Sequence, residues 1–317
     1  MIVTVGLNPA IDKILIVPGF RPGATNRATI ERVDVGGKGI NVALNLRRFG
    51  CDVMATGFVG AEDRYAIPAT LARSGIAADF VTVPGETRVN LKVIDPLSGH
   101  ETEINEPGLA VPSPAIEALA ARLRTLSRRA TVMVFSGSLP PEVPADLYAR
   151  LIALARAEGV RTVLDTAGAA LAHGVSAGPD LAKPNRAEAE ELLEASIGDE
   201  DSLVAAASSI LALGARSVVL SLGAGGALSA SAAELCRARP PAVAVRSTVG
   251  AGDAMVAALA YGLMKSLALS DALRLATAAS CAVAAWGQSA TAEQIETLMP
   301  QISIAATQAR APARSPR

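Results

Sequence analysis

The amino-acid sequence predicts an α/β protein built on a doubly wound, mostly parallel β-sheet flanked by helices. From residue 113 onward, short apolar segments of strand character alternate with alanine- and leucine-rich segments of helical spacing. The chain has 317 residues and is 50% hydrophobic, which is enough to bury a large core. Two β-rich stretches interrupt the alternation in the amino-terminal part, so a small second sheet is also expected.

The amino-terminal third supplies the first strand and the small sheet. Residues 1–5 are predicted to form a buried strand, which Asn8-Pro9 ends. Residues 13–35 and 87–106 alternate loosely around turns rich in proline, glycine and asparagine, which predicts short antiparallel strands. We expect these two ranges to form a lid on the main domain.

The rest of the chain is predicted to consist of regular βα units. The predicted helices cover residues 115–126, 145–158, 187–195 and 203–213, and the predicted strands cover residues 131–135, 161–164, 217–222 and 242–246, with one more ending at 183–185. Parallel strands place their carboxyl ends along one edge, where ligands bind in open α/β sheets. The side chains expected along that edge are Asp12, Ser136, Asp165, Asn185, Ser221 and Asp253. Residues 1–308 are expected to form one domain, and residues 309–317 a disordered tail.

Composition argues against several classes of protein. The formal net charge of −1 gives no reason to expect nucleic acid or an anionic membrane as a partner. No apolar run approaches the roughly 18 residues of a membrane span, and no basic leader precedes the first strand, so a cytoplasmic location is expected. Three widely spaced cysteines and only two histidines predict neither a disulfide framework nor a histidine-based metal site.

The segment 247–265 contains the candidate catalytic group. Gly250 and Gly252 form a turn before an apolar helix, so backbone N–H groups and the helix dipole would meet an anion there. Asp253, at the start of that helix, could accept a proton from an attacking hydroxyl. An alternative interpretation is that Asp253 only caps the helix, since aspartate is a preferred N-cap residue.

A second glycine-rich loop covers residues 35–45 and also leads into an apolar helix. Lys38 lies within it and could contact an anion. The loop is not a Walker A motif, because Gly39 follows the lysine where that motif has serine or threonine. Alternatively, it is an ordinary glycine turn with a solvated lysine.

Together these segments resemble the PfkB (ribokinase-like) family of carbohydrate kinases. Residues 35–43 (VGGKGINVA) resemble its first motif and residues 247–255 (STVGAGDAM) its second, and the resemblance runs from residue 1 to about 299. Four shorter stretches are similar to the phosphofructokinase branch, most of all to 1-phosphofructokinases: residues 7–12, 87–90, 102–108 and 136–140. The resemblance implies a ribokinase-like fold with a small β-sheet lid.

The resemblance also implies ATP-dependent phosphorylation of a sugar phosphate, with fructose 1-phosphate converted to fructose 1,6-bisphosphate. Fructose 6-phosphate or tagatose 6-phosphate is the alternative substrate within the family. An alternative of another class is a sensor that binds a sugar phosphate or nucleotide without turnover. A base such as Asp253 argues against the sensor, because binding alone needs none.

Residue roles follow from the same resemblance. It implies that Asp253 is the general base and that the amides of Gly250, Ala251 and Gly252 form the anion hole. The implied substrate-binding residues are Asp12, Gly37, Lys38, Asn41, Arg88, Asn90 and Ser138. The implied ATP-binding residues are Lys183, Asn185, Ser221, Gly223, Gly226 and Thr248, with Asn185 and Glu188 organising Mg²⁺ through water.

Two positions depart from the family pattern, and one surface suggests assembly. Ala254 and Ala167 stand where serine is common, so activity is expected to be tuned rather than lost. The small sheet would have open edges, and pairing with a second chain would cover them. We therefore expect a homodimer formed through the lid.

Overall fold

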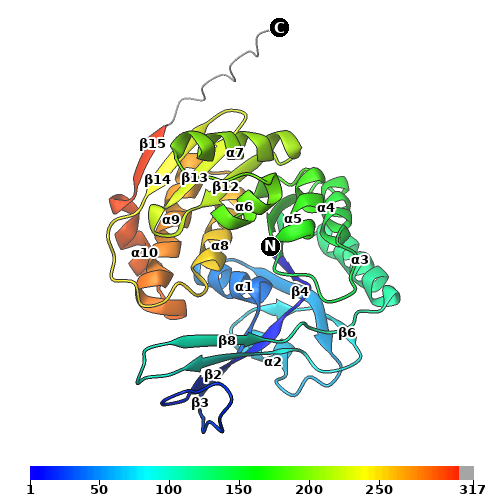
Figure 1. The fold of residues 1–317 in the computed structure, drawn as a ribbon. Helices are drawn as coiled ribbons and strands as arrows, with labels where there is room; N and C mark the ends of the chain where they lie inside the picture. Colours follow the sequence, from blue (N-terminus) through cyan, green and yellow to red (C-terminus); the bar gives the residue numbers. More distant parts are fainter. Residues whose placement is uncertain (307–317) are drawn as a thin grey trace.

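The computed structural model describes residues 1–306, apart from the side chain of Ser289, so the tail expected at 309–317 lies outside the described residues. Two sheets make up the architecture, and helices cover both faces of the larger one (Figure 1). Within the described range no helix combines the length and the apolarity needed to cross a bilayer.

The larger sheet has eleven strands within the described residues. Its order is β15-β14-β13-β12-β11-β10-β9-β1-β4-β5, with β6 also paired to β4. The strands are β1 (Ile2–Gly6), β4 (Val53–Gly60), β5 (Ala77–Ala78), β6 (Val81–Val83), β9 (Val132–Ser136), β10 (Arg161–Asp165), β11 (Leu181–Ala182), β12 (Ser217–Ser221), β13 (Ala227–Ser231), β14 (Leu235–Arg239) and β15 (Ser303–Ala306). All neighbours from β5 to β12 are parallel, and β12 to β15 are antiparallel. The predicted doubly wound, mostly parallel sheet is confirmed.

Successive side chains on a strand point to opposite faces of the larger sheet, and each face packs into its own hydrophobic core. On β9, Val132 and Val134 pack with one set of helices, whereas Met133 and Phe135 pack with the other. The first set is α1 (Lys38–Arg48), α2 (Ile67–Arg73), α8 (Ala251–Met264), α9 (Leu269–Trp286) and α10 (Ala292–Leu298). The second set is α3 (Ser113–Ser127), α4 (Leu147–Ala157), α5 (Gly168–Ser176), α6 (Arg186–Leu193) and α7 (Glu200–Leu213). Both faces of the sheet are therefore buried.

The small sheet has the order β3-β2-β7-β8 and lies beside α1 at the bottom of Figure 1. Its strands are β2 (Ala10–Ile16), β3 (Thr29–Gly36), β7 (Val89–Ile94) and β8 (Glu101–Asn105). The two β-rich stretches do form one small sheet, as predicted. They meet through the parallel pair β2–β7, however, and only β2–β3 and β7–β8 are antiparallel.

Two local predictions were wrong. Residues 242–246, expected to be a strand, form an irregular and largely exposed segment. Pro240 and Pro241 precede it and supply no N–H donors, so the ladder stops at β14 and does not resume there. Asp12 was expected just beyond the first strand, but it lies on β2 and therefore belongs to the small sheet.

Candidate active site

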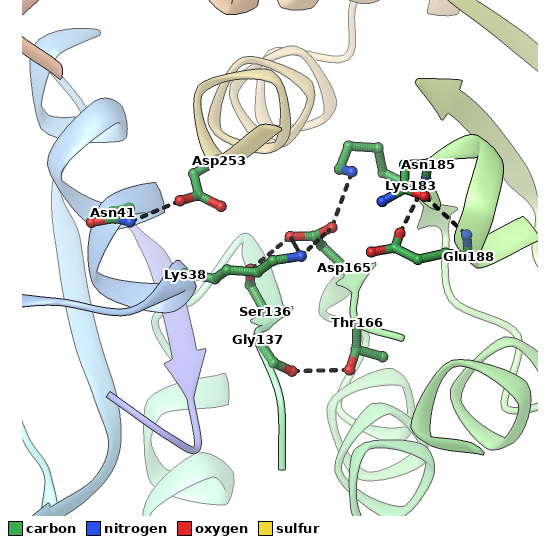
Figure 2. A network of polar contacts seen from close by, with 10 residues as sticks. All are labelled: Lys38, Asn41, Ser136, Gly137, Asp165, Thr166, Lys183, Asn185, Glu188 and Asp253. Atoms are coloured by element: carbon green, nitrogen blue, oxygen red, sulfur yellow. Dashed lines mark hydrogen bonds and ion pairs between the residues drawn. The ribbon is translucent and has the colours of Figure 1, made fainter. Parts of the chain in front are cut away.

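Asp253 lies in the first turn of α8, and its side chain is only 7% exposed. The N-cap residue of α8 is Gly250, and Asp253 is the third residue of the helix. The Oδ2 atom of Asp253 accepts from Asn41 Nδ2 on α1 at 2.8 Å (Figure 2). The interpretation of Asp253 as a mere helix cap is therefore wrong. Gly250 before the helix has φ 79°, and a Cβ there would collide with Gln288, so this turn requires glycine.

The surroundings of Asp253 raise its pKa to about 6. Burial is the largest cause, because it disfavours the charged form, and the nearby carboxylate of Asp165 adds repulsion. The Asn41 hydrogen bond and the positive charges of Lys38 and Lys183 oppose this rise. The result is a carboxylate that is ionised at pH 7 yet basic enough to take a proton.

Asp165 holds two lysines in the centre of the site (Figure 2). It ends β10 and is buried. Its carboxylate lies 3.3 Å from Lys38 Nζ and 3.1 Å from Lys183 Nζ, and it accepts a hydrogen bond from Ser136 Oγ at 3.0 Å. Burial alone would raise the pKa of Asp165, but the attraction of Lys183 and Lys38 outweighs it and holds the pKa below its usual value.

Lys38 is thus ion-paired with Asp165 in the site, while its side chain stays 40% exposed. Burial lowers its pKa, but Coulombic attraction from Asp165, Glu188 and Asp253 more than compensates, so the pKa is raised and the ammonium stays charged. Sequence reasoning placed Asp165 at the strand edge without assigning it to the site. Its position at the last residue of an apolar strand, at the ligand-binding edge, was the available signal.

A pocket of about 550 Å³ opens at the carboxyl edge of the larger sheet. Of the predicted substrate residues, Gly37, Lys38, Arg88 and Ser138 line it. Glu188 and the apolar N-terminal part of α5 form another part of its wall. The described residues lining the pocket include neither Asp253 nor the predicted substrate residues Asp12, Asn41 and Asn90, nor any of the six predicted ATP-binding residues. Lys38 lies both in the wall of this pocket and in the group of charged residues around Asp253, which we call the Asp253 cluster. Its members are Lys38, Asp165, Lys183 and Asp253.

Asp12 and Asn90 face each other across β2 and β7. They are register partners, and Asn90 Nδ2 donates to Asp12 Oδ1 at 2.9 Å. Burial raises the pKa of Asp12, and the Asn90 hydrogen bond partly offsets this rise. The other side-chain atom, Asn90 Oδ1, is buried with no hydrogen-bond partner among the described residues. Such an acceptor is costly to leave unsatisfied and suits a hydroxyl donor from a ligand.

The predicted nucleotide and metal residues lie around β12 and the start of α6. Asn185 and Glu188 form a capping box: Asn185 Oδ1 accepts from Glu188 N at 2.9 Å, and Glu188 Oε2 accepts from Asn185 N at 2.8 Å. Ser221 forms a β-bridge with Asn185, and a 3₁₀ turn follows at Gly223–Gly225 before Gly226. Thr248 is exposed in the segment before α8. Of these residues only Glu188 lines the 550 Å³ pocket within the described structure.

Arg237, which was not predicted from the sequence, stabilises the 3₁₀ turn at Gly223–Gly225 through hydrogen bonds. Its buried guanidinium donates to the carbonyls of Gly225 at 2.8 Å and Ala227 at 2.9 Å, and it pairs with Glu200 at 3.0 Å. Nothing in the local sequence around Arg237 identifies these partners, because Gly225 lies twelve residues away in the 3₁₀ turn before β13.

These features fit an enzyme that transfers an anionic group to a hydroxyl. A carboxylate of raised pKa lies at the amino end of a helix beside a glycine turn, with two lysines close by.

Comparison with known proteins identifies the family. The pfkB family carbohydrate kinases match residues 1–297. A 1-phosphofructokinase of Rhodobacter capsulatus is 43% identical over 88% of this chain and 89% of its own. Phosphofructokinase-2 of Escherichia coli superposes with TM-scores of 0.88 in complex with fructose-6-phosphate and 0.89 in its tetrameric inhibited form, each at 30% identity over 94% of this chain and 98% of its own. The chain therefore belongs to the pfkB family of carbohydrate kinases.

Membership makes the chain a phosphotransferase with an alcohol group as acceptor and ATP as donor. The family and the ribokinase-like α/β fold expected from the two glycine-containing motifs are both confirmed.

Proposed function

We propose that the chain phosphorylates fructose 1-phosphate at its C6 hydroxyl, with ATP as donor. The observation that carries this proposal is Asp253, a buried carboxylate with a pKa of about 6 directly after the Gly250–Gly252 turn. Asp253 takes the proton of the attacking hydroxyl, and the turn amides stabilise the transferring phosphoryl group. The similarity to a 1-phosphofructokinase supports the choice of sugar.

The other predicted residues divide between the two substrates. Asp12 and Asn90 bind sugar hydroxyls, which is consistent with the unsatisfied Asn90 Oδ1. Gly37, Lys38, Asn41, Arg88 and Ser138 complete the sugar-phosphate side of the site. Lys183, Asn185, Ser221, Gly223, Gly226 and Thr248 bind the nucleotide.

Magnesium fits this site only as an ion held largely by water and phosphate oxygens. Among the described residues no group of three or more His, Cys, Asp or Glu side chains could hold a metal. Mg²⁺ commonly keeps several of its waters and uses substrate phosphates, so Asn185 and Glu188 would organise it through water. When bound, it would neutralise phosphate charge.

The test is ADP release with Mg-ATP, comparing kcat/KM for fructose 1-phosphate, fructose 6-phosphate, tagatose 6-phosphate and ribose. We expect fructose 1-phosphate to be preferred. Preference for fructose 6-phosphate, which the E. coli structure binds, would favour the second candidate and reverse the sugar in the site. Tight binding with no ADP release from any sugar would favour a sensor.

Activity is expected to fall as the pH drops through about 6, because protonated Asp253 cannot act as a base. The phosphate ester also titrates near pH 6. The discriminating measurement is therefore kcat at saturating sugar and ATP, which reports groups in the bound complex. An acidic limb in kcat at or above pH 6 agrees with the assignment, and a flat kcat from pH 5 to 8 contradicts it.

We also propose a homodimer in the cytoplasm that forms through the small sheet. Val33, Lys13, Leu91 and Ile104 are consecutive register partners across its four strands, so they share one face. Val33 is 40% exposed and Ile104 51% exposed. A second copy would cover the exposed Val33 and Ile104 side chains on this face, and the lid could then close over the sugar. A monomeric mass across working concentrations would remove the dimer.

A further inference from the structure

Asparagine 8 connects segments that are distant in the sequence. Its side-chain Nδ2 donates to the carbonyl of Pro107 at 3.0 Å and to Ser138 Oγ at 3.2 Å. These partners lie 99 and 130 residues away, one after the last strand of the small sheet and one in the loop after β9. Asn8 is 9% exposed and lines the 550 Å³ pocket.

Arginine 88 fixes the backbone around the same point. Its guanidinium donates to the carbonyls of Asn8 at 3.1 Å, Pro9 at 3.4 Å and Glu106 at 3.0 Å. A guanidinium carries five N–H donors. The three hydrogen bonds given for the described residues therefore leave up to two N–H groups that could donate to an oxyanion. Arg88 therefore lines the pocket and also connects the small sheet to the β1–β2 loop through hydrogen bonds.

Glycine 108 provides the space for the Asn8 amide. It has φ 114°, and a Cβ built on it would collide with Asn8 Oδ1. Any side chain at 108 would thus displace the amide as well as strain the backbone. The four stretches that resemble the phosphofructokinase branch, 7–12, 87–90, 102–108 and 136–140, all contribute to this one junction.

We propose that Asn8 is a positioning residue that fixes Ser138 and Arg88 as the binding site for the phosphate already on the sugar. This inference rests on the proposed function. A Ser138 hydroxyl that accepts from Asn8 keeps its own O–H for donation to a phosphate oxygen. Because Asn8 does not touch the Asp253 cluster, it sets sugar affinity and sugar choice, and not phosphoryl transfer or ATP binding.

The test uses Asn8→Ala and the isosteric Asn8→Asp, which keeps the volume but replaces both N–H donors with an acceptor. Gln301→Ala is the control, since Gln301 Nε2 also donates to a carbonyl, that of Thr297 at 3.0 Å, but at an exposed position outside the lid and the site. We expect both Asn8 variants to raise the KM for fructose 1-phosphate about 10- to 100-fold, as for lost hydrogen bonds to a charged ligand. The KM for ATP should stay within about twofold, and the control should match wild type.

Equilibrium binding separates this inference from the proposed function. Calorimetric titration with fructose 1-phosphate alone should show the same loss of affinity in the Asn8 variants, whether or not the wild type turns the sugar over. Unchanged sugar affinity, or equal losses for sugar and ATP, would overturn the role of Asn8. Failure of both variants to fold, judged by thermal melting, would also overturn it, because Asn8 would then be structural.

Discussion

Replacement of Asp253 by asparagine is expected to lower kcat by about 10²- to 10⁴-fold, the usual contribution of a general base. The amide has nearly the same shape and its oxygen can still accept from Asn41 Nδ2, but it cannot take a proton from the sugar hydroxyl. The measurement is steady-state ADP release at saturating sugar phosphate and ATP.

The same substitution is expected to stabilise the fold at neutral pH. The folded-state pKa of Asp253 lies near 6, above its usual value of 3.8. The folded protein therefore binds this proton more tightly than the unfolded chain does, and stability is lost as the pH rises through 6. A neutral amide removes that loss, which is on the order of 2–3 kcal/mol. Higher thermal stability together with lower activity would separate a catalytic effect from misfolding.

Asp271 offers a matched control for this variant. It occupies the third helical position of α9, as Asp253 does in α8, but it is exposed. Asp271→Asn should leave kcat unchanged and alter stability by less than about 0.5 kcal/mol. Near-wild-type turnover by a folded Asp253→Asn variant would contradict the assigned mechanism.

The sequence allowed features of the site and the fold to be predicted where they depend on residues close together in the chain. The turn at Gly250, the proposed base Asp253 and the loop around Lys38 could be identified because each lies within one short segment with a characteristic pattern of residue types. The helices α3, α4, α6 and α7 and the parallel strands between them were predicted within a few residues, because apolar spacing depends only on near neighbours, whereas the short helix α5 was missed.

Contacts between distant segments could not be predicted in this way. Lys38 and Asp165 are 127 residues apart, and only the parallel order of β9 and β10 beside α1 brings them together. The junction at Asn8 likewise depends on how the small sheet docks. The strand wrongly predicted at 242–246 shows the opposite case. Valines favour a strand there, but the segment is irregular and largely exposed, because no neighbouring strand forms backbone hydrogen bonds with it.

The site therefore depends on a balance of buried charge. Two carboxylates, Asp165 and Asp253, lie among two ammonium groups, Lys38 and Lys183. Each lysine lowers the pKa of both acids, while Asp165 raises the pKa of Asp253. The raised pKa of Asp253, on which its proposed role as base depends, is thus set partly by Asp165, a residue that need not touch the sugar.

Asp165→Asn is expected to be the most destabilising single substitution in the site. It would leave Lys183, which is 3% exposed, without its carboxylate partner. Removing one member of a buried ion pair typically costs about 3–5 kcal/mol, which for a chain of this length corresponds to a fall in Tm of about 4–8 °C. Glu117→Gln is the control: it breaks an exposed pair with Arg150, so a change below about 1 kcal/mol is expected.

The pH dependence of this loss gives the sharper test. The folded pKa of Asp165 lies below its unfolded value, so its stabilisation is present above the unfolded pKa and is lost as the pH falls through the folded one. The difference in stability between wild type and Asp165→Asn should therefore be large at pH 7 and shrink toward pH 3. If enough folded variant remains to assay, its acidic limb in kcat should move to lower pH, because the repulsion that raises the pKa of Asp253 is gone. A limb that stays in place would show that burial alone sets the basicity of Asp253.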